Sequence, residues 1–232
     1  MSRTKPRSTG SSNPATKFLQ WNTQASAWEF YDKEAQMSKT LPLDTGFIVL
    51  DQLITAKGWD DRKNSAIWSN EAYTVGDKFT LRNKDGIVAT GTWAEVKPVH
   101  GVKFTKSVYA MAKVGEGYEL VTLQLKGCAL TAWIDFEEKV GGSNRLEGDV
   151  VVAVIEAIED RKGVVTYNRP IFSIVSNTLS DEAALQADRM DGILQEYLSS
   201  YLKVDKPTAE DYEEESELEI TYSEPQVIAN PF

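Results

Sequence analysis

Cysteine and histidine are almost absent from the sequence, which contains one residue of each, Cys128 and His100. A single cysteine excludes an internal disulfide framework and fits a reducing compartment. A single histidine leaves any catalytic triad or histidine-rich zinc site dependent on that one residue. Neither the GxxxxGK[ST] phosphate loop nor the GxGxxG dinucleotide fingerprint occurs. The sequence therefore predicts a protein that is not an enzyme and that uses neither a metal nor a cofactor.

Long hydrophobic runs are also missing. No apolar stretch reaches the length needed to span a membrane, and the polar, basic start lacks the features of a signal peptide. We therefore expect no membrane partner and a location in the cytoplasm.

Acidic residues outnumber basic ones, 35 to 25, but the excess is unevenly distributed. Residues 1–17 carry four bases and no acid, and residues 18–204 carry twenty bases and twenty-six acids. Residues 205–232 carry nine acids and one base, so they account for −8 of the net charge of −10. The middle of the chain is only mildly acidic, and whether it has a basic face depends on how its lysines cluster.

Three segments follow from this composition. Residues 1–16 are basic and rich in Ser, Thr, Pro and Gly, which predicts a flexible arm. Residues 17–204 are enough for one domain with its own core. Residues 205–232 are acidic and lack a sustained apolar period, which predicts a disordered tail.

The middle segment shows short apolar runs separated by turn residues, a pattern typical of a barrel or sandwich. Asp85-Gly86 and Gly115-Glu116-Gly117 are strong hairpin signals because glycine supplies the positive φ of such turns. We predict a mainly β fold, an OB-like β-barrel of about nine or ten short strands. The candidate strand segments are residues 17–21, 27–31, 46–53, 79–82, 87–93, 102–114, 118–125, 129–136, 150–158, 164–167 and 171–175.

One amphipathic helix is predicted over residues 180–203. Ser180 can cap it, and Asp181 and Glu182 fall in its first turn. Its apolar stripe is expected to pack on the barrel, and the alternative is a helix offered to a second subunit, which leaves a homodimer open. The stripe consists of Met190, Ile193, Leu194, Tyr197, Leu198, Tyr201 and Leu202.

Residues 96–115 contain no acid and combine bases with aromatic residues. Strand alternation places Lys103, Thr105 and Ser107 on one face. A protein that binds single strands needs cations for the phosphates and aromatic faces for unpaired bases, and this arm has both. The alternative is an ordinary solvated edge. The candidate residues in this arm are Lys97, Lys103, Phe104, Lys106, Tyr109 and Lys113.

Residues 56–71 are predicted to form a long polar loop that carries Trp59 and Trp68. Lys57, Arg62 and Lys63 lie between or beside these indoles and suit phosphate contact and cation–π stacking. The alternative is that the indoles fold back over the end of the barrel. Of the other tryptophans, most are expected in the core, whereas Trp21 and Trp93 are candidates for lining a groove.

The acidic tail ends in Pro231-Phe232, and an exposed terminal aromatic predicts insertion into the pocket of a partner. The alternative is that the acidic tail only aids solubility and that the terminal Phe is accidental. An acidic tail closing in Pro-Phe resembles the C-terminal tails of single-stranded DNA-binding proteins of bacteria and their phages. That resemblance implies that the tip recruits replication proteins such as a polymerase, helicase or primase, and that the acids compete with DNA. The sequence departs from the pattern because residues 225–230 separate the acids from the tip.

A wider resemblance covers about the first third of the chain. TKFLQW at residues 16–21 and LPLDTGFIVLDQLITAKGWDDRKNSAIWSNE at residues 41–71 resemble single-stranded DNA-binding proteins of tailed bacteriophages, notably crAss-like phages. The resemblance implies an oligonucleotide-binding (OB) barrel, coating of replication intermediates in the host bacterial cytoplasm and recruitment of replication proteins through the tail.

Together these features predict a protein that binds single-stranded DNA without strong sequence preference during phage DNA replication or recombination. Phosphates are expected to contact Lys57, Arg62, Lys63, Lys97, Lys103, Lys106 and Lys113, and bases to stack on some of Trp59, Trp68, Trp93, Phe104 and Tyr109. Two alternatives remain: an acidic DNA mimic that inhibits another protein, and a virion or scaffold protein that assembles through residues 180–203.

Overall fold

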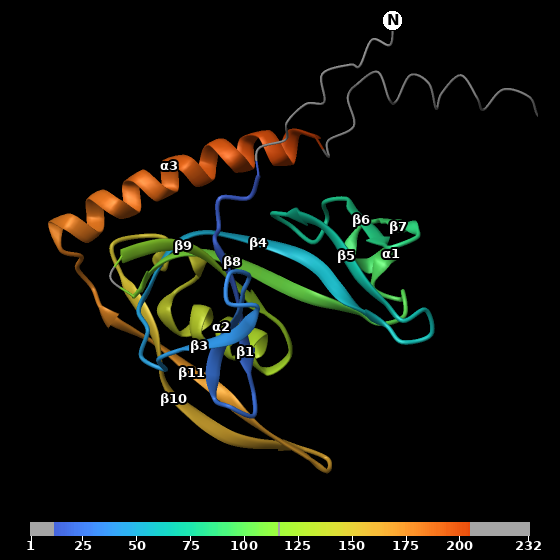
Figure 1. Cartoon of the computed structure of the whole chain (residues 1–232), viewed down its shortest axis with the longest axis horizontal. Helices are drawn as coiled ribbons and strands as arrows, with labels where there is room; N and C mark the ends of the chain where they lie inside the picture. The colour runs from blue at the N-terminus through green and yellow to red at the C-terminus, as the bar shows by residue number, and fades with distance from the viewer. Residues whose placement is uncertain (1–11, 116, 205–232) are drawn as a thin grey trace, which may run out of the picture.

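A computed structural model describes residues 12–115 and 117–204. Strands dominate this part of the chain, and one long helix follows them, which confirms the prediction of a mainly β protein with a C-terminal helix (Figure 1). The eleven strands belong to one sheet. They are β1 (Lys17–Asn22), β2 (Ala27–Asp32), β3 (Met37–Leu41), β4 (Phe47–Asp60), β5 (Ser65–Ala72), β6 (Phe79–Asn83), β7 (Gly86–Gly91), β8 (Val102–Val114), β9 (Gly117–Leu125), β10 (Val151–Lys162) and β11 (Val165–Ser176). The helices are α1 (Trp93–Val96), α2 (Gly127–Val140), α3 (Asp181–Val204) and a short 3-10 helix (Ser143–Arg145).

Strand β4 is the centre of the sheet. It pairs antiparallel with β8 from Phe47 to Gly58, with β5 along its second half, and with β10 at Phe47. The sheet order is β3-β2-β1-β9-β8-β4-β5-β6-β7, and the β10–β11 hairpin branches from the start of β4. Because β3 and β7 end this order without pairing with each other, the described sheet is not closed and the barrel stays a prediction.

The larger core lies on one face of the sheet, here called the inner face, and is rich in aromatic rings. Trp28 and Phe47 meet edge to face at 5.8 Å between ring centroids, and Trp133 meets Phe172 at 4.9 Å. Such edge contacts add to the stabilisation that burial itself provides. Trp21 is also buried, so the prediction that most of the strand tryptophans lie in the core is confirmed.

Helix α2 covers this core, and the prediction of a strand over residues 129–136 is wrong. Its buried side chains recur at intervals of three and four, which is the period of a helix and not of a strand. Gly141 ends the helix in the left-handed conformation, with φ of 95°, as glycine commonly does after a last turn. The buried residues are Ala129, Ala132, Trp133 and Phe136.

Helix α3 forms where the sequence predicts it and lies along the opposite, outer face of the sheet (Figure 1). The Ser180 hydroxyl accepts a hydrogen bond from the Ala183 N–H at 3.2 Å, which supports the predicted cap. The helix packs by its apolar stripe, as expected, although Ile193 remains 47% exposed. The contact joins Leu194, Tyr197 and Leu198 of α3 to Leu53, Tyr109 and Leu120 of the sheet.

Residues 56–71 form a strand hairpin, so the prediction of a long loop there is wrong. β4 continues to Asp60 and β5 begins at Ser65, which leaves a short turn in which Asn64 adopts a positive φ of 47°. Ala56 and Ile67 are buried on the side of α1, and the residues that follow them are more exposed. The many polar residues of this segment obscure that alternation in the sequence.

The remaining boundaries differ in smaller ways. Strand β3 was not expected, residues 165–176 form one strand where two segments were expected, and Trp93 starts α1 instead of ending a strand. Ordered structure also begins before residue 17, since Ala15 is buried and the Thr16 N–H donates to the Leu120 carbonyl at 2.9 Å. Residues 1–11 and 205–232, predicted to be a flexible arm and a disordered tail, lie outside the described residues.

The docking of α3 can be tested at two adjacent positions. Leu194 is fully buried, so Leu194→Ala should lower the free energy of unfolding by about 2–5 kcal/mol. Ile193→Ala, the matched control, should cost about 1 kcal/mol or less because its side chain is half exposed. Urea unfolding followed by circular dichroism measures both. Equal, small effects would mean that α3 does not dock on the sheet in solution.

Candidate nucleic-acid interface

A row of basic and aromatic side chains crosses four strands on the outer face, beyond the end of α3. Trp68 of β5 lies directly opposite Arg82 of β6 on one side and Lys57 of β4 on the other. Lys57 in turn lies opposite Lys103 of β8. Directly opposed residues of antiparallel strands share a face, so these side chains form one continuous row. We call Arg82, Trp68, Lys57 and Lys103 the basic row.

Both indoles of the β4–β5 hairpin are exposed. Trp59 lies two residues beyond Lys57 on the same face of β4 and is 54% exposed, and Trp68 is 42% exposed. The inner side of the same hairpin is filled by Ile67, Leu81 and their neighbours against α1, so neither indole is needed to complete a core. Two large apolar rings left open to water on one face are typical of a binding surface.

Three lysines, Lys57, Lys103 and Lys126, lie near one another at the end of the basic row. Lys126, directly after β9, faces this region and donates to the Gln20 side chain at 2.9 Å. Burial lowers the pKa of Lys57, Glu71 opposes the shift and Lys126 adds to it. Burial and the nearby charge of Lys103 lower the pKa of Lys126 as well. Among the described residues, no carboxylate lies within ion-pair distance of Lys57, Lys103 or Lys126.

The end of α3 borders the basic row. The Tyr201 hydroxyl accepts a hydrogen bond from the Glu71 N–H at 2.9 Å, and Glu71 lies opposite Thr55, one pairing before Lys57 and Trp68. The Glu71 carboxylate also accepts a hydrogen bond from the Tyr109 hydroxyl at 2.7 Å. The helix therefore covers the outer face up to Glu71 and leaves the basic row open.

Two predicted contact residues are engaged within the protein. Tyr109 is fully buried beneath α3, so its ring cannot stack on a base while the helix is docked. Burial and the Glu71 carboxylate raise the pKa of Tyr109. Lys106 points to the inner side and forms an ion pair with Glu137 of α2 at 2.5 Å, with both side chains largely buried. Strand alternation explains both placements, but the sequence does not say which element covers each face.

The other predicted residues lie away from the basic row or at its edge. Trp93 and Phe104 pack edge to face at 5.1 Å on the side of α1, and Lys97 is exposed at the end of that helix. Arg62 and Lys63 are exposed in the β4–β5 turn, close to Trp59 in sequence. Pro231 and Phe232, predicted to bind a partner, lie outside the described residues.

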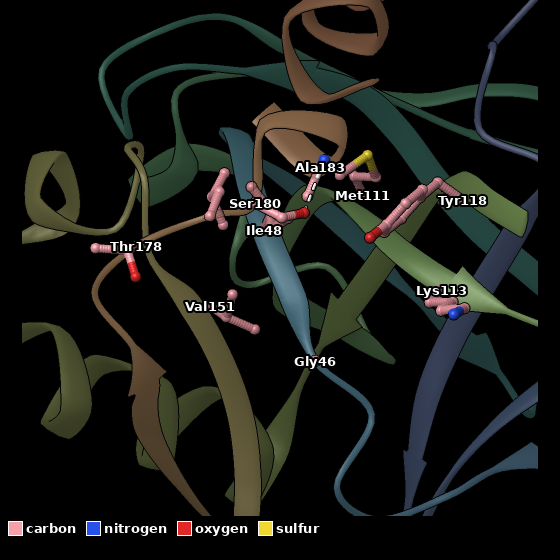
Figure 2. A pocket seen from close by; sticks show the side chains of 10 residues that line it. Gly46, Ile48, Met111, Lys113, Tyr118, Val151, Thr178, Ser180 and Ala183 are labelled. Carbon is pink, nitrogen blue, oxygen red and sulfur yellow. Dashed lines mark hydrogen bonds between the residues drawn. The ribbon is translucent and has the colours of Figure 1, made fainter. Parts of the chain in front are cut away.

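Lys113 lies at the opposite end of β8, on the rim of a cavity of about 280 Å³ at the start of α3. Figure 2 shows its side chain beside Tyr118, with Met111 and Ile48 forming apolar walls. Most of the length of β8 therefore lies between Lys113 and the basic row.

Arg82 and Lys126 belong to the face but were not among the predicted contacts. The expected strand over residues 79–82 contains Arg82, yet only the pairing of β6 with β5 brings it beside Trp68. Lys126 follows β9, and the pairing of Lys106 with Leu125 places it near Thr105 on the outer face. Both placements depend on register between strands, for which the sequence offers no local signal.

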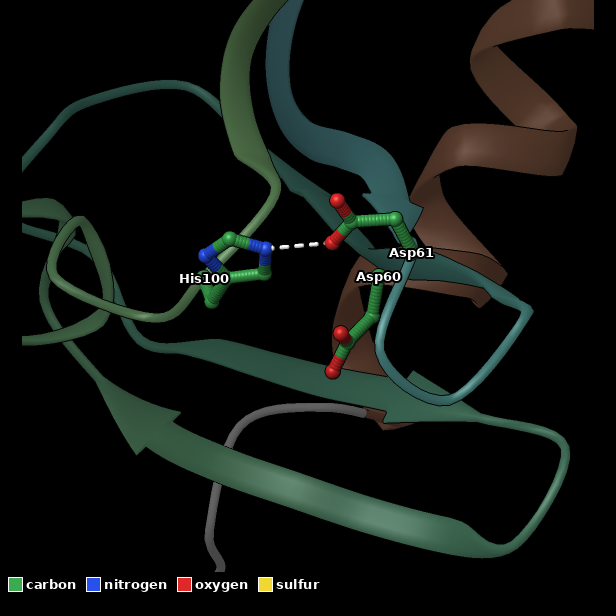
Figure 3. A group of neighbouring side chains, drawn as sticks. All are labelled: Asp60, Asp61 and His100. Atoms are coloured by element: carbon green, nitrogen blue, oxygen red, sulfur yellow. Dashed lines mark hydrogen bonds and ion pairs between the residues drawn. The ribbon is translucent and has the colours of Figure 1, made fainter.

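A second cluster joins the β4–β5 turn to the segment before β8. The His100 Nε2 and the Asp61 Oδ1 are 2.5 Å apart (Figure 3), and this hydrogen bond lowers the pKa of Asp61. Asp60 is only 5% exposed, and it accepts hydrogen bonds from Arg62. The three side chains bring ligand atoms within 4.8 Å, as a divalent cation would need. Arg62 and His100 already engage these carboxylates, and the bond between His100 and Asp61 ties the two segments together.

Comparison of the chain with protein-family models, with curated proteins and with solved structures finds no match. Within the described residues, none of the helices is both long enough and apolar enough to cross a membrane. The function therefore has to be inferred from the outer face itself.

Two lysines of β8 that the sequence treats alike should respond differently to substitution. Lys106→Ala leaves the Glu137 carboxylate largely buried without its partner, so it should lower the free energy of unfolding by about 1–3 kcal/mol. Lys103→Ala, the matched control, should change it by about 0.5 kcal/mol or less because Lys103 is exposed. Urea unfolding of both variants checks the assignment, and a larger effect at Lys103 would contradict it.

Proposed function

We propose that the protein binds single-stranded DNA without strong sequence preference through the outer face of the β6–β5–β4–β8 sheet. The observation that carries the proposal is the basic row, with its exposed indole between cationic side chains on a surface that no described element covers. A single strand of DNA that crosses this row passes cationic side chains on β6, β4 and β8 and a flat aromatic ring on β5.

The chemistry of the row favours single strands over paired ones. Trp68 and Trp59 offer ring faces, and stacking is available only to bases that are not already stacked in a duplex. Stacking also accepts any base, because every base has a π face. The row contains no arrangement of amide and carboxylate side chains that would read base edges, so binding should depend little on sequence.

The chain connectivity supports an OB-like reading of the core. β4, β8 and β9 form an antiparallel meander, α2 follows, and β10 of the next hairpin returns to pair with β4. OB folds bind nucleic acid on the face of their second and third strands and on the adjacent loops. In this reading β8 is the second strand, and β5, β6, β7 and α1 extend the loop before it.

In the cell, the protein would coat single-stranded intermediates of phage DNA replication or recombination in the host bacterial cytoplasm, as its sequence resemblance implies. The acidic residues 205–232 would serve to recruit replication proteins and would compete with DNA for the basic row. Their starting point supports the competition, because α3 ends beside Glu71 at the border of that row. The protein would act without catalysis and without a cofactor.

The scaffold alternative loses the feature that suggested it. Most of the apolar stripe of α3 packs on the protein's own sheet, which favours DNA binding over assembly through this helix. The DNA-mimic alternative makes the opposite prediction for the basic row, since a mimic of DNA has no reason to bind an oligonucleotide.

Binding to oligo-dT tests the proposal. Tryptophan fluorescence should be quenched on titration, and log affinity should fall with log salt with a slope of about −3, from roughly four phosphate contacts at −0.7 each. Trp68→Ala should weaken binding by about 1–3 kcal/mol through loss of one stacked base. Lys103→Glu should weaken it at least about tenfold, since it replaces an attraction by a repulsion in the row.

The matched controls lie on the same chain but off the row. Lys97→Glu and Lys113→Glu carry the same charge change at exposed positions, so a general effect of net charge would appear in all three reversals. Equal losses in the three variants, or no binding of oligo-dT by the wild type, would contradict the proposed interface.

Removal of residues 205–232 provides a separate test of competition. The deletion removes a net charge of −8 from the chain, so oligo-dT should bind roughly three- to tenfold more tightly at low salt if these acids compete with it. The difference should shrink as salt shortens the Debye length. The measurement is the same titration on the two forms at several salt concentrations. Unchanged or weaker binding after the deletion would exclude competition within the chain.

A further inference from the structure

Three lysines lie on neighbouring strands at the end of the basic row. Lys57 and Lys103 are directly opposed across β4 and β8. The pairing of Lys106 with Leu125 places Lys126 beside Thr105, two residues from Lys103, where its ammonium group also donates to Gln20. Like charges directly opposed on a sheet are destabilising, and burial adds a desolvation cost at Lys57. The only acid described near Lys57 is Glu71, whose carboxylate is bonded to Tyr109 and lies beyond ion-pair distance. The cluster therefore has an unbalanced positive charge.

A buried hydroxyl without a partner lies at the same spot. Thr105 is 1% exposed, and no described group forms a hydrogen bond with its Oγ1. It follows Lys103 on the outer face of β8 and lies opposite Thr55, whose own hydroxyl is bonded to Ser69. A buried polar group without a partner costs about 1–3 kcal/mol, and an acceptor bound beside Lys103 would remove that cost at Thr105.

We infer that Lys57, Lys103 and Lys126, with the Thr105 hydroxyl beneath them, form an anchoring site for one phosphate group. A phosphate oxygen can accept from several ammonium groups and from a hydroxyl at once, which meets both unsatisfied features. The flexible lysine side chains would move apart to admit it. The inference rests on the proposed function for its ligand, a phosphodiester of single-stranded DNA, and the chemistry of the site is the same for free phosphate.

The position next to Trp68 gives the site a role in the path of the strand. Trp68 is the direct neighbour of Lys57 across β4 and β5, about 5 Å away at the backbone. A phosphate anchored among the lysines thus places the base of an adjoining nucleotide over the exposed indole. The anchoring site would fix the position of the DNA strand on this face, and the indole would stack on any base placed next to it.

Two conservative variants test the site, with Lys97→Met as the matched control. Lys126→Met removes one cation, so it should reduce the oligo-dT salt slope by about 0.7 and weaken binding several-fold at low salt. Thr105→Val keeps the side-chain shape without the hydroxyl, so it should weaken binding about threefold. Both variants should also raise the melting temperature of the ligand-free protein, because each removes an unfavourable feature of the free state. Lys97→Met should change neither binding nor melting.

Inorganic phosphate and pyrophosphate serve as probes without a base. Pyrophosphate should raise the melting temperature of the wild type and the control, but not that of Lys126→Met. If oligo-dT binds while both site variants match the control, the anchoring site is wrong and the proposed function stands. If pyrophosphate protects the wild type through these lysines but oligo-dT does not bind, the site stands and the proposed function fails.

Discussion

The antiparallel register between β4 and β8 is the constraint on which the rest of the structure depends. It is fixed at one end by a close approach of two backbones that only glycine permits. A β carbon at Gly58 would lie 1.8 Å from the Gly101 carbonyl oxygen, and one at Gly101 would lie 2.1 Å from the Trp59 carbonyl oxygen. A slip by one residue would turn Lys57 away from Lys103 and would expose the face that binds α3.

That register lets one sheet face serve two purposes along its length. At the start of β8 the outer face carries Lys103, and farther along it carries Tyr109, which α3 buries. Between them lie Thr105 and Ser107, whose hydroxyls have no hydrogen-bond partner among the described groups. Apolar burial can stabilise the covered half, whereas charges in the open half would lose their hydration if the helix extended over them. The last described turn of α3 accordingly lies beside Glu71.

The parts of the fold that could be predicted are those with a strong local signal. The helix at residues 180–203 has a clear period and cap, and the Asp-Gly turn at residue 86 fixes the β6–β7 hairpin. The strand predicted over residues 129–136 fails because a short apolar run suits a buried strand and a buried helix alike. The loop predicted over residues 56–71 fails because its outward residues are polar or indole, which conceals Ile67 and Ala56. Neither error could be corrected without knowing what covers each face.

The same limit decides which site residues the sequence could supply. Lys57, Trp59, Trp68 and Lys103 are found by composition alone, and strand pairing brings them onto one face. Lys106 and Tyr109 are likewise a cation and an aromatic residue of the same segment. Glu137 and Glu71, which are far away in the chain, engage them within the protein. Local sequence can therefore indicate which residue types a binding face contains. Which individual residues belong to that face depends on strand register and on what docks on each side of the sheet. Arg82 and Lys126 were not predicted as contacts, and only the strand register brings them to this face.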